Sequence, residues 1–243
     1  MVDWHNSSKL RPAVCCDAGI IDTIPLFSGL HSSVLSRLAS ISRVVDFAAG
    51  SNVCEQDDAA SDLFFVLEGK VSLINTAPNG ETVIVEVIQE GGYFGLAPVL
   101  ARMPYLATAK AVTTIRLLMM DGRAINDLVQ VESALLERVI RAEALDFSSI
   151  VQQVCDLKFR TTSQRLACYL LNLVSEKSDN GATFRLPFDK RLLAGRIGCR
   201  QENLSRAFAA LRAEGVETHG ASVVLHDIER LKRYALGNPA HQK

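Results

Sequence analysis

The stretch Gly198–Gly215, GCRQENLSRAFAALRAEG, has the pattern of one short helix enclosed by two glycines. Its apolar residues recur at i, i+4 and i+7 and predict one buried face, made of Leu204, Phe208 and Leu211. Three polar residues at i, i+3 and i+4 share a different face, namely Glu202, Ser205 and Arg206. Because many charged helix faces are merely solvated, the function of this one depends on what surrounds the helix.

A second short helix is predicted directly before this stretch. Asp189 is its expected N-cap, and its apolar side consists of Leu192, Leu193 and Ile197. Gly198 ends that helix and the next one begins at once, which is the pattern of a helix-turn-helix motif. The following segment 216–227, VETHGASVVLHD, has two β-rich pieces around His219 and Gly220 and predicts a wing.

A helix-turn-helix places its second helix in the major groove of DNA, with the N-terminal residues against base edges. Arg206 can donate a fork of hydrogen bonds to guanine O6 and N7, and Glu202 can accept one from cytosine N4. Ser205 suits a base or a phosphate, and the cations near the helix start suit phosphates. The predicted DNA-binding residues are Lys190, Arg191, Arg200, Gln201, Glu202, Ser205 and Arg206.

Charge is distributed unevenly along the 243 residues, although the net charge is only −1. From Lys158 onward there are 15 Lys and Arg against 8 Asp and Glu, whereas residues 1–157 hold 11 against 19. A basic C-terminal third beside an acidic remainder indicates that the C-terminal part binds a polyanion. The charge pattern therefore favours DNA binding over a merely solvated helix face.

The composition is typical of a globular protein, with 48% hydrophobic and 22% charged residues. The first 19 residues lack the apolar core of a signal peptide, and no run of about 18 apolar residues occurs, so we expect neither export nor a membrane span. The six scattered cysteines are then expected to be reduced thiols. The predicted location is cytoplasmic.

Residues 20–122 are predicted to form a strand-rich effector or sensor domain, after a flexible arm of irregular sequence at 1–19. One helix is expected near residues 32–41, with Ser32 or Ser33 as its N-cap. Five β-type runs lie between about 44 and 120, and the PNG of 78–80 predicts a hairpin between two of them. Short strands at this spacing predict a sandwich or barrel.

Residues 123–157 return to helical spacing and are predicted to form one dimerisation helix. A heptad seam runs through this segment at alternating steps of four and three residues, comprising Leu136, Ile140, Glu143, Phe147, Ile150, Val154 and Leu157. Sustained spacing of 3.5 residues favours a two-stranded coiled coil, and hence a homodimer. A helix packed against its own sheet gives a similar stripe, so that alternative stays open.

The order of strand-rich domain, long helix and winged helix-turn-helix at 158–243 resembles the Crp/Fnr transcription regulators, over almost the whole chain. FAAGSNVCEQDDAASDLFFVLEGKVSLI at 47–74 is similar to the β-roll of that family, with Asp57 where a glycine is usual. GCRQENLSRAFAAL at 198–211 matches the E-x-x-S-R pattern of the Fnr branch. Arg200 departs from the Thr common at its position, which affects the cap of the helix rather than base reading.

The resemblance implies an α+β fold: an N-terminal cyclic-nucleotide-binding-type β-roll, a long dimerisation helix and a C-terminal winged helix-turn-helix. It also implies a homodimeric activator or repressor that binds a palindromic TTGAT-like site and contacts RNA polymerase. Glu202, Ser205 and Arg206 would read the half-sites. A small effector in the β-roll would shift the dimer helix, so that both recognition helices match half-sites one DNA turn apart.

The effector region expected from this resemblance is GYFGLAPVLARMPYLATAKA at 92–111, with the predicted pocket residues Gly95, Leu96, Tyr105 and Thr108. In the family a Glu binds the ribose of a cyclic nucleotide and an Arg pairs with its phosphate. Leu96 takes the place of that Glu, and Tyr105 or Leu106 takes the place of that Arg, while Arg102 is out of register. A buried phosphate needs a charged partner, so the sequence disfavours a cyclic nucleotide.

Two other cofactors are conceivable for this family. An iron–sulfur cluster needs four thiolates, but the N-terminal region offers only Cys15, Cys16 and, farther on, Cys54, which disfavours it. PYLATAKAV at 104–112 is similar to the Dnr/Nnr regulators, nitric-oxide-responsive members associated with haem. That resemblance favours haem, with His31 as a candidate axial ligand, although His31 also suits an ordinary surface position at a helix start.

Two further function classes compete with a DNA-binding regulator. An enzyme built on the strand-rich domain is disfavoured because the sequence has no H-E-x-x-H, Walker loop, G-x-S-x-G or Cys/His metal spacing. A nucleotide-binding module that acts on a protein partner is disfavoured by the basic C-terminal third. The sequence therefore predicts a transcription regulator and no enzyme.

Overall fold

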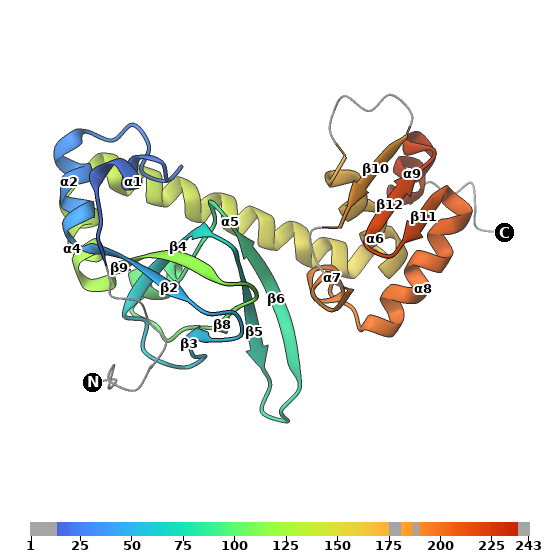
Figure 1. The fold of residues 1–243 in the computed structure, drawn as a ribbon, viewed down its shortest axis with the longest axis horizontal. Coiled ribbons are helices and arrows are strands. Elements are labelled where there is room, and N and C mark those ends of the chain that lie inside the picture. The colour runs from blue at the N-terminus through green and yellow to red at the C-terminus, as the bar shows by residue number, and fades with distance from the viewer. Residues whose placement is uncertain (1–13, 175–180, 187–189, 238–243) are drawn as a thin grey trace. The chain divides into compact units, whose positions relative to one another are not determined.

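The computed structural model describes residues 14–174, 181–186 and 190–237, in two compact units of residues 1–147 and 148–243 (Figure 1). The predicted cap Asp189 lies outside the described residues. Of the predicted arm 1–19, the described part departs from the prediction. Val14 and Cys15 form a strand that pairs with Val44 and Arg43, and a helix begins at Ala18.

Two antiparallel sheets form the β-roll of unit 1, as the strand-rich sequence predicts. The five-stranded sheet has the order β1 (Val14–Cys15), β2 (Ser42–Phe47), β9 (Ile115–Asp121), β4 (Asp62–Glu68) and β7 (Tyr93–Phe94). The four-stranded sheet has the order β3 (Asn52–Cys54), β8 (Thr108–Ala111), β5 (Lys70–Thr76) and β6 (Thr82–Gln89). The predicted hairpin joins β5 to β6.

Strands β4 and β9 are buried on both faces, which explains their nearly continuous apolar sequences. One set of alternating side chains packs in the core shared with the four-stranded sheet, namely Phe64, Val66, Leu117 and Met119. The opposite set packs against helices, namely Leu63, Phe65, Leu118 and Met120. The effector region 92–111 contributes to both cores, with Tyr105 in the core between the sheets and Leu96 in the helix-covered core.

The helical cover of unit 1 consists of α1 (Ala18–Asp22), α2 (Ser32–Ser40), α3 (Leu96–Ala101) and α4 (Gly122–Val131). The N-cap of α2 is His31, not Ser32 or Ser33, because the His31 ring accepts a hydrogen bond from the backbone N–H of Ser33. Among the described residues, no helix combines the length and the apolar character needed to cross a membrane.

The predicted helix over 123–157 is divided in two. Helix α4 ends at Val131, Glu132 adopts an extended conformation, and α5 (Ser133–Phe159) begins after it. Leu135 and Val139 of α5 are buried in the helix-covered core of unit 1. The six apolar side chains of the heptad seam lie on other faces of α5 and are 39% to 68% exposed. The seam is therefore not used to pack α5 against its own sheet.

Unit 2 is a helical domain with a small three-stranded sheet. Its elements are α6 (Thr162–Asn172), β10 (Ala182–Arg185), α7 (Lys190–Ile197), α8 (Gln201–Leu211), a 3₁₀ turn (Arg212–Glu214), β11 (Val216–His219), β12 (Ser222–Leu225) and α9 (Ile228–Ala235). The sheet order is β10-β12-β11, and Gly220 lies in the turn of the β11–β12 hairpin with φ of +62°. This is a helix-turn-helix followed by a wing, as the sequence predicts.

Candidate DNA-binding site and effector region

Helix α8 separates its apolar and polar residues as the spacing predicts. Leu204 and Leu211 are completely buried and Phe208 is nearly so, in the single core of unit 2. Gln201, Glu202, Ser205 and Arg206 are all exposed. The structure therefore brings the predicted base-reading residues together on one open face in the N-terminal half of α8.

The turn between α7 and α8 requires glycine at position 198. Gly198 has φ of +69°, a left-handed conformation that other residues adopt only with strain. A Cβ atom on Gly198 would lie 2.8 Å from Cδ2 of Leu157, near the end of α5. The backbone N–H of Cys199 donates to the carbonyl of Ala194 at 2.9 Å and closes the turn. The turn thus fixes the point from which α8 starts.

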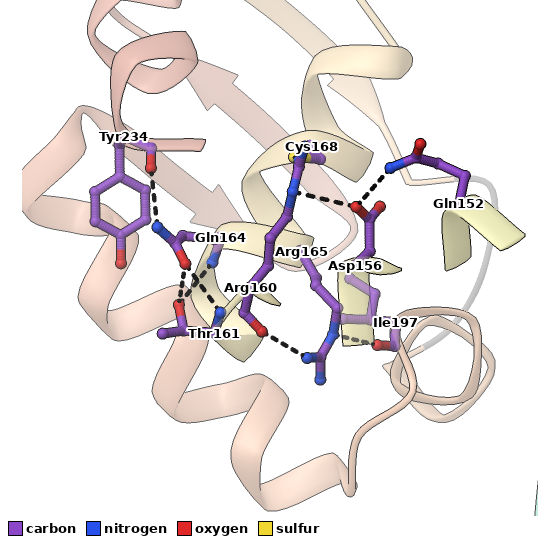
Figure 2. Close-up of polar contacts among 9 residues, drawn as sticks. All are labelled: Gln152, Asp156, Arg160, Thr161, Gln164, Arg165, Cys168, Ile197 and Tyr234. Atoms are coloured by element: carbon purple, nitrogen blue, oxygen red, sulfur yellow. Dashed lines mark hydrogen bonds and ion pairs between the residues drawn. The ribbon is translucent and has the colours of Figure 1, made fainter. Parts of the chain in front are cut away.

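Arg165 of α6 holds the carbonyl groups of this turn, and Figure 2 shows its position. Its Nε donates to the carbonyl of Ile197 at 2.9 Å, and one terminal nitrogen reaches the carbonyl of Gly198 at 3.3 Å. The other terminal nitrogen donates to the carbonyl of Arg160 at 2.9 Å, just after α5. One half-buried guanidinium therefore joins the end of α5 to the turn before the recognition helix. Sequence reasoning missed this role, since no local pattern reveals it.

The junction between α5 and α6 has a polar network of its own (Figure 2). Arg160 forms an ion pair with Asp156, with an Nε–Oδ1 distance of 3.2 Å, and also contacts the thiol of Cys168. Thr161 and Gln164 form a reciprocal capping box that starts α6. These contacts satisfy the backbone groups at the helix start and fix the direction in which α6 leaves α5.

The remaining predicted DNA contacts are cations at helix starts. Lys190 and Arg191 are exposed at the start of α7. Arg200 is the N-cap residue of α8, and its side chain makes no capping hydrogen bond. A guanidinium has no acceptor atom, so replacing the usual Thr removes the cap, as the sequence suggests.

The predicted effector residues Gly95 and Tyr105 lie close together, and both are packed against the backbone of Asp62. The Tyr105 hydroxyl donates to the carbonyl of Asp62 at 2.7 Å and accepts from its N–H at 3.0 Å. Burial raises the pKa of Tyr105 to about 12. Gly95 has φ of +88°, and a Cβ there would lie 3.1 Å from the same carbonyl. Both residues therefore serve the packing of β4, and the Tyr105 hydroxyl already has its partners.

The other two predicted pocket residues, Leu96 and Thr108, have different packing and hydrogen-bond partners. Leu96 is 2% exposed and packs in the helix-covered core, so it does not occupy the core between the two sheets. The Thr108 hydroxyl accepts a hydrogen bond from the backbone N–H of Gln56 at 3.0 Å. Leu106, the other residue at the place of the phosphate-binding Arg, is 64% exposed and uncharged. The four predicted pocket residues thus do not converge on one site.

The predicted axial ligand His31 lies at the start of α2, where its ring makes a local contact. Its Nδ1 accepts the backbone N–H of Ser33 at 3.3 Å and lies 2.8 Å from the Ser33 hydroxyl oxygen, so this ring nitrogen is used in the cap. Among the described residues, no group of three His, Cys, Asp or Glu side chains is placed to hold a metal ion. In this structure His31 is the cap of α2.

Comparison with known proteins agrees with this division of the chain. Residues 44–132 match the cyclic nucleotide-binding domain, and residues 164–234 match the Crp-like helix-turn-helix domain. The chain is 25% identical to a CRP-like cAMP-activated global transcriptional regulator of Mycobacterium tuberculosis, over 86% of this chain and 96% of that protein.

Two further relatives extend the comparison. The nitrogen fixation regulation protein FixK of Bradyrhizobium diazoefficiens is 24% identical, over 87% of each chain. A solved structure of a CRP-family transcriptional regulator from Thermus thermophilus is 26% identical with a TM-score of 0.60, over 78% of this chain and 95% of that one.

A sensor-type β-roll and a winged helix-turn-helix with an open polar recognition face define a DNA-binding transcription regulator. The chain belongs to the Crp/Fnr family of such regulators. The matched regulators are not enzymes, in agreement with the absence of catalytic motifs from the sequence.

Proposed function

We propose that this regulator binds a palindromic TTGAT-like site as a homodimer and that a small effector switches it. The main support for DNA binding is the exposed face of α8, where Glu202, Ser205 and Arg206 lie together. The opposite face of the helix is packed in the core. Within the described part of the chain, Glu202 and Arg206 do not pair with each other, although they lie four residues apart. Their polar groups are therefore available to base edges.

The proposed contacts divide into two kinds. Arg206 donates to guanine and Glu202 accepts from cytosine, so these two side chains read sequence, while Ser205 serves a base or a phosphate. Lys190, Arg191, Arg200 and Gln201 at the helix starts bind phosphates and set the position of α8 in the groove. The basic balance of the C-terminal part supplies the general attraction to DNA.

The exposed heptad seam of α5 supports the homodimer. Phe147 is 68% exposed and Ile150 is 57% exposed, on a helix whose other side is anchored by Leu135 and Val139. A row of large apolar side chains at 3.5-residue spacing is the seam of a two-stranded coiled coil. A second copy of α5 is the partner with matching spacing, and the dimer places two copies of α8 at two half-sites.

Replacing Arg206 by Ala tests base reading. We expect the variant to lose about 1–3 kcal/mol of binding free energy per half-site on a TTGAT-type palindrome and little on a scrambled duplex, because a guanine contact is lost. Lys190→Ala should weaken both duplexes equally, because a phosphate contact carries no sequence information. Fluorescence anisotropy at fixed salt measures both. Equal losses for Arg206→Ala on the two duplexes would contradict the base contact.

Introducing a charged residue into the heptad seam of α5 tests whether this helix forms the dimer interface. Phe147→Asp or Ile150→Asp places two carboxylates against each other in an apolar core, so we expect monomers in analytical ultracentrifugation. Val83→Asp, at an exposed apolar residue of β6, is the matched control and should leave the dimer intact. A dimer that persists in both seam variants would show that α5 is not the interface.

For the effector, we propose haem sensing nitric oxide, on the similarity of 104–112 to the Dnr/Nnr regulators. His31 remains the candidate axial ligand, and binding haem through Nδ1 would require it to give up the cap of α2. The alternative is a cyclic nucleotide, which the matched domain and the cAMP-activated relative favour. We further propose that the protein works in the cytoplasm and contacts RNA polymerase, as its family resemblance implies.

Calorimetry with cyclic AMP separates the two effectors. Leu106 carries no charge for the phosphate, and Tyr105 is committed to Asp62, so we expect weak binding even at millimolar ligand. An absorption spectrum of the protein with haem, before and after nitric oxide, should show a bound Soret band that shifts. A micromolar dissociation constant for cyclic AMP together with no haem spectrum would favour the alternative.

A further inference from the structure

We infer that the hollow between α8 and the wing binds a backbone phosphate of DNA, with Arg212 as its cationic ligand. This inference rests on the proposed DNA binding and adds a contact outside the recognition motif. The hollow has a volume of about 180 Å³. The residues that line it include Lys190, Ser205, Ala209, Arg212, Thr218 and Gly220.

The hollow forms because one strip of α8 faces the wing. Ser205, Ala209 and Arg212 follow at i, i+4 and i+7, which places them on the same side of the helix and its 3₁₀ extension. The small Ala209 leaves space between the two polar residues. Thr218 of β11 and Gly220 of the wing turn close the other side.

The charge of the hollow suits an anion. Lys190 and Arg212 are exposed cations, and Thr218 adds a hydroxyl group. The Ser205 hydroxyl also lines the hollow, where it donates to the carbonyl of Gln201 at 3.3 Å. The described lining contains no carboxylate that would oppose a phosphate. Ser205 also belongs to the proposed base-reading face, so a duplex held by Glu202 and Arg206 brings its backbone toward the same strip of the helix.

A phosphate contact at Arg212 has a distinct signature. Each phosphate that a protein neutralises contributes about 0.9 to the slope of log K against log salt on double-stranded DNA. A homodimer contains the hollow twice, so loss of both contacts should make that slope shallower by about 1.8. The change should be the same on a TTGAT-type palindrome and on a scrambled duplex, because phosphates carry no sequence information.

The test measures affinity for both duplexes over a salt series with the full-length protein. Arg212→Ala should show the shallower slope, Arg212→Lys should keep the wild-type slope, and Arg233→Ala, an exposed arginine on α9, is the control. Ala209→Met fills the hollow without changing charge and should weaken both duplexes by one common factor. Circular dichroism verifies that each variant is folded.

A wild-type slope for Arg212→Ala would overturn the inference, and so would a loss confined to the palindrome. If the wild-type protein binds both duplexes equally, the proposed base reading is contradicted instead. The change in the salt slope caused by Arg212→Ala on either duplex would then still test the phosphate contact. Binding to neither duplex would overturn both.

Discussion

The left-handed turn at Gly198 is the constraint on which the DNA-reading surface depends. Its φ of +69° strains any residue other than glycine, and the carbonyl groups of the turn are held by Arg165. The direction of α8 follows from that turn, since the helix starts three residues later, at Gln201, without a side-chain cap. Base reading tolerates little displacement, because a bidentate contact fixes both distance and angle. The hydrogen bonds to the turn hold the start of α8 in place, although its N-cap residue makes no side-chain hydrogen bond.

The sequence predicts the recognition helix well because its information is local. Spacing alone separates Leu204 and Phe208 from Glu202 and Arg206, and the packed core of unit 2 confirms that division. The heptad seam of α5 can also be recognised from the sequence, since a repeat of 3.5 residues is a pattern within one helix. The short strands β3, β7 and β8 escape prediction, because pairing with distant segments makes them strands.

The roles of other residues could not be predicted from the sequence, because they depend on contacts between distant segments or on which atoms of a side chain form hydrogen bonds. In the sequence nothing distinguishes Arg165 from other helical arginines, and its role follows only from its hydrogen bond to the carbonyl of Ile197. His31 looks like a ligand or a surface residue, and the hydrogen bond from Ser33 makes it a cap. Tyr105 marks the effector region in the sequence, yet its hydroxyl is bound to the backbone of Asp62.

Two copies of α8 in a symmetric dimer should read DNA sequence. Selection of bound duplexes from a random pool, followed by sequencing, measures this property. We expect enrichment of a palindrome with TTGAT-like half-sites one helical turn apart, and loss of the preferred base at one position in each half-site when Arg206 is replaced by Ala. A pool that enriches no motif, or a motif without two-fold symmetry, would contradict sequence reading by a symmetric dimer.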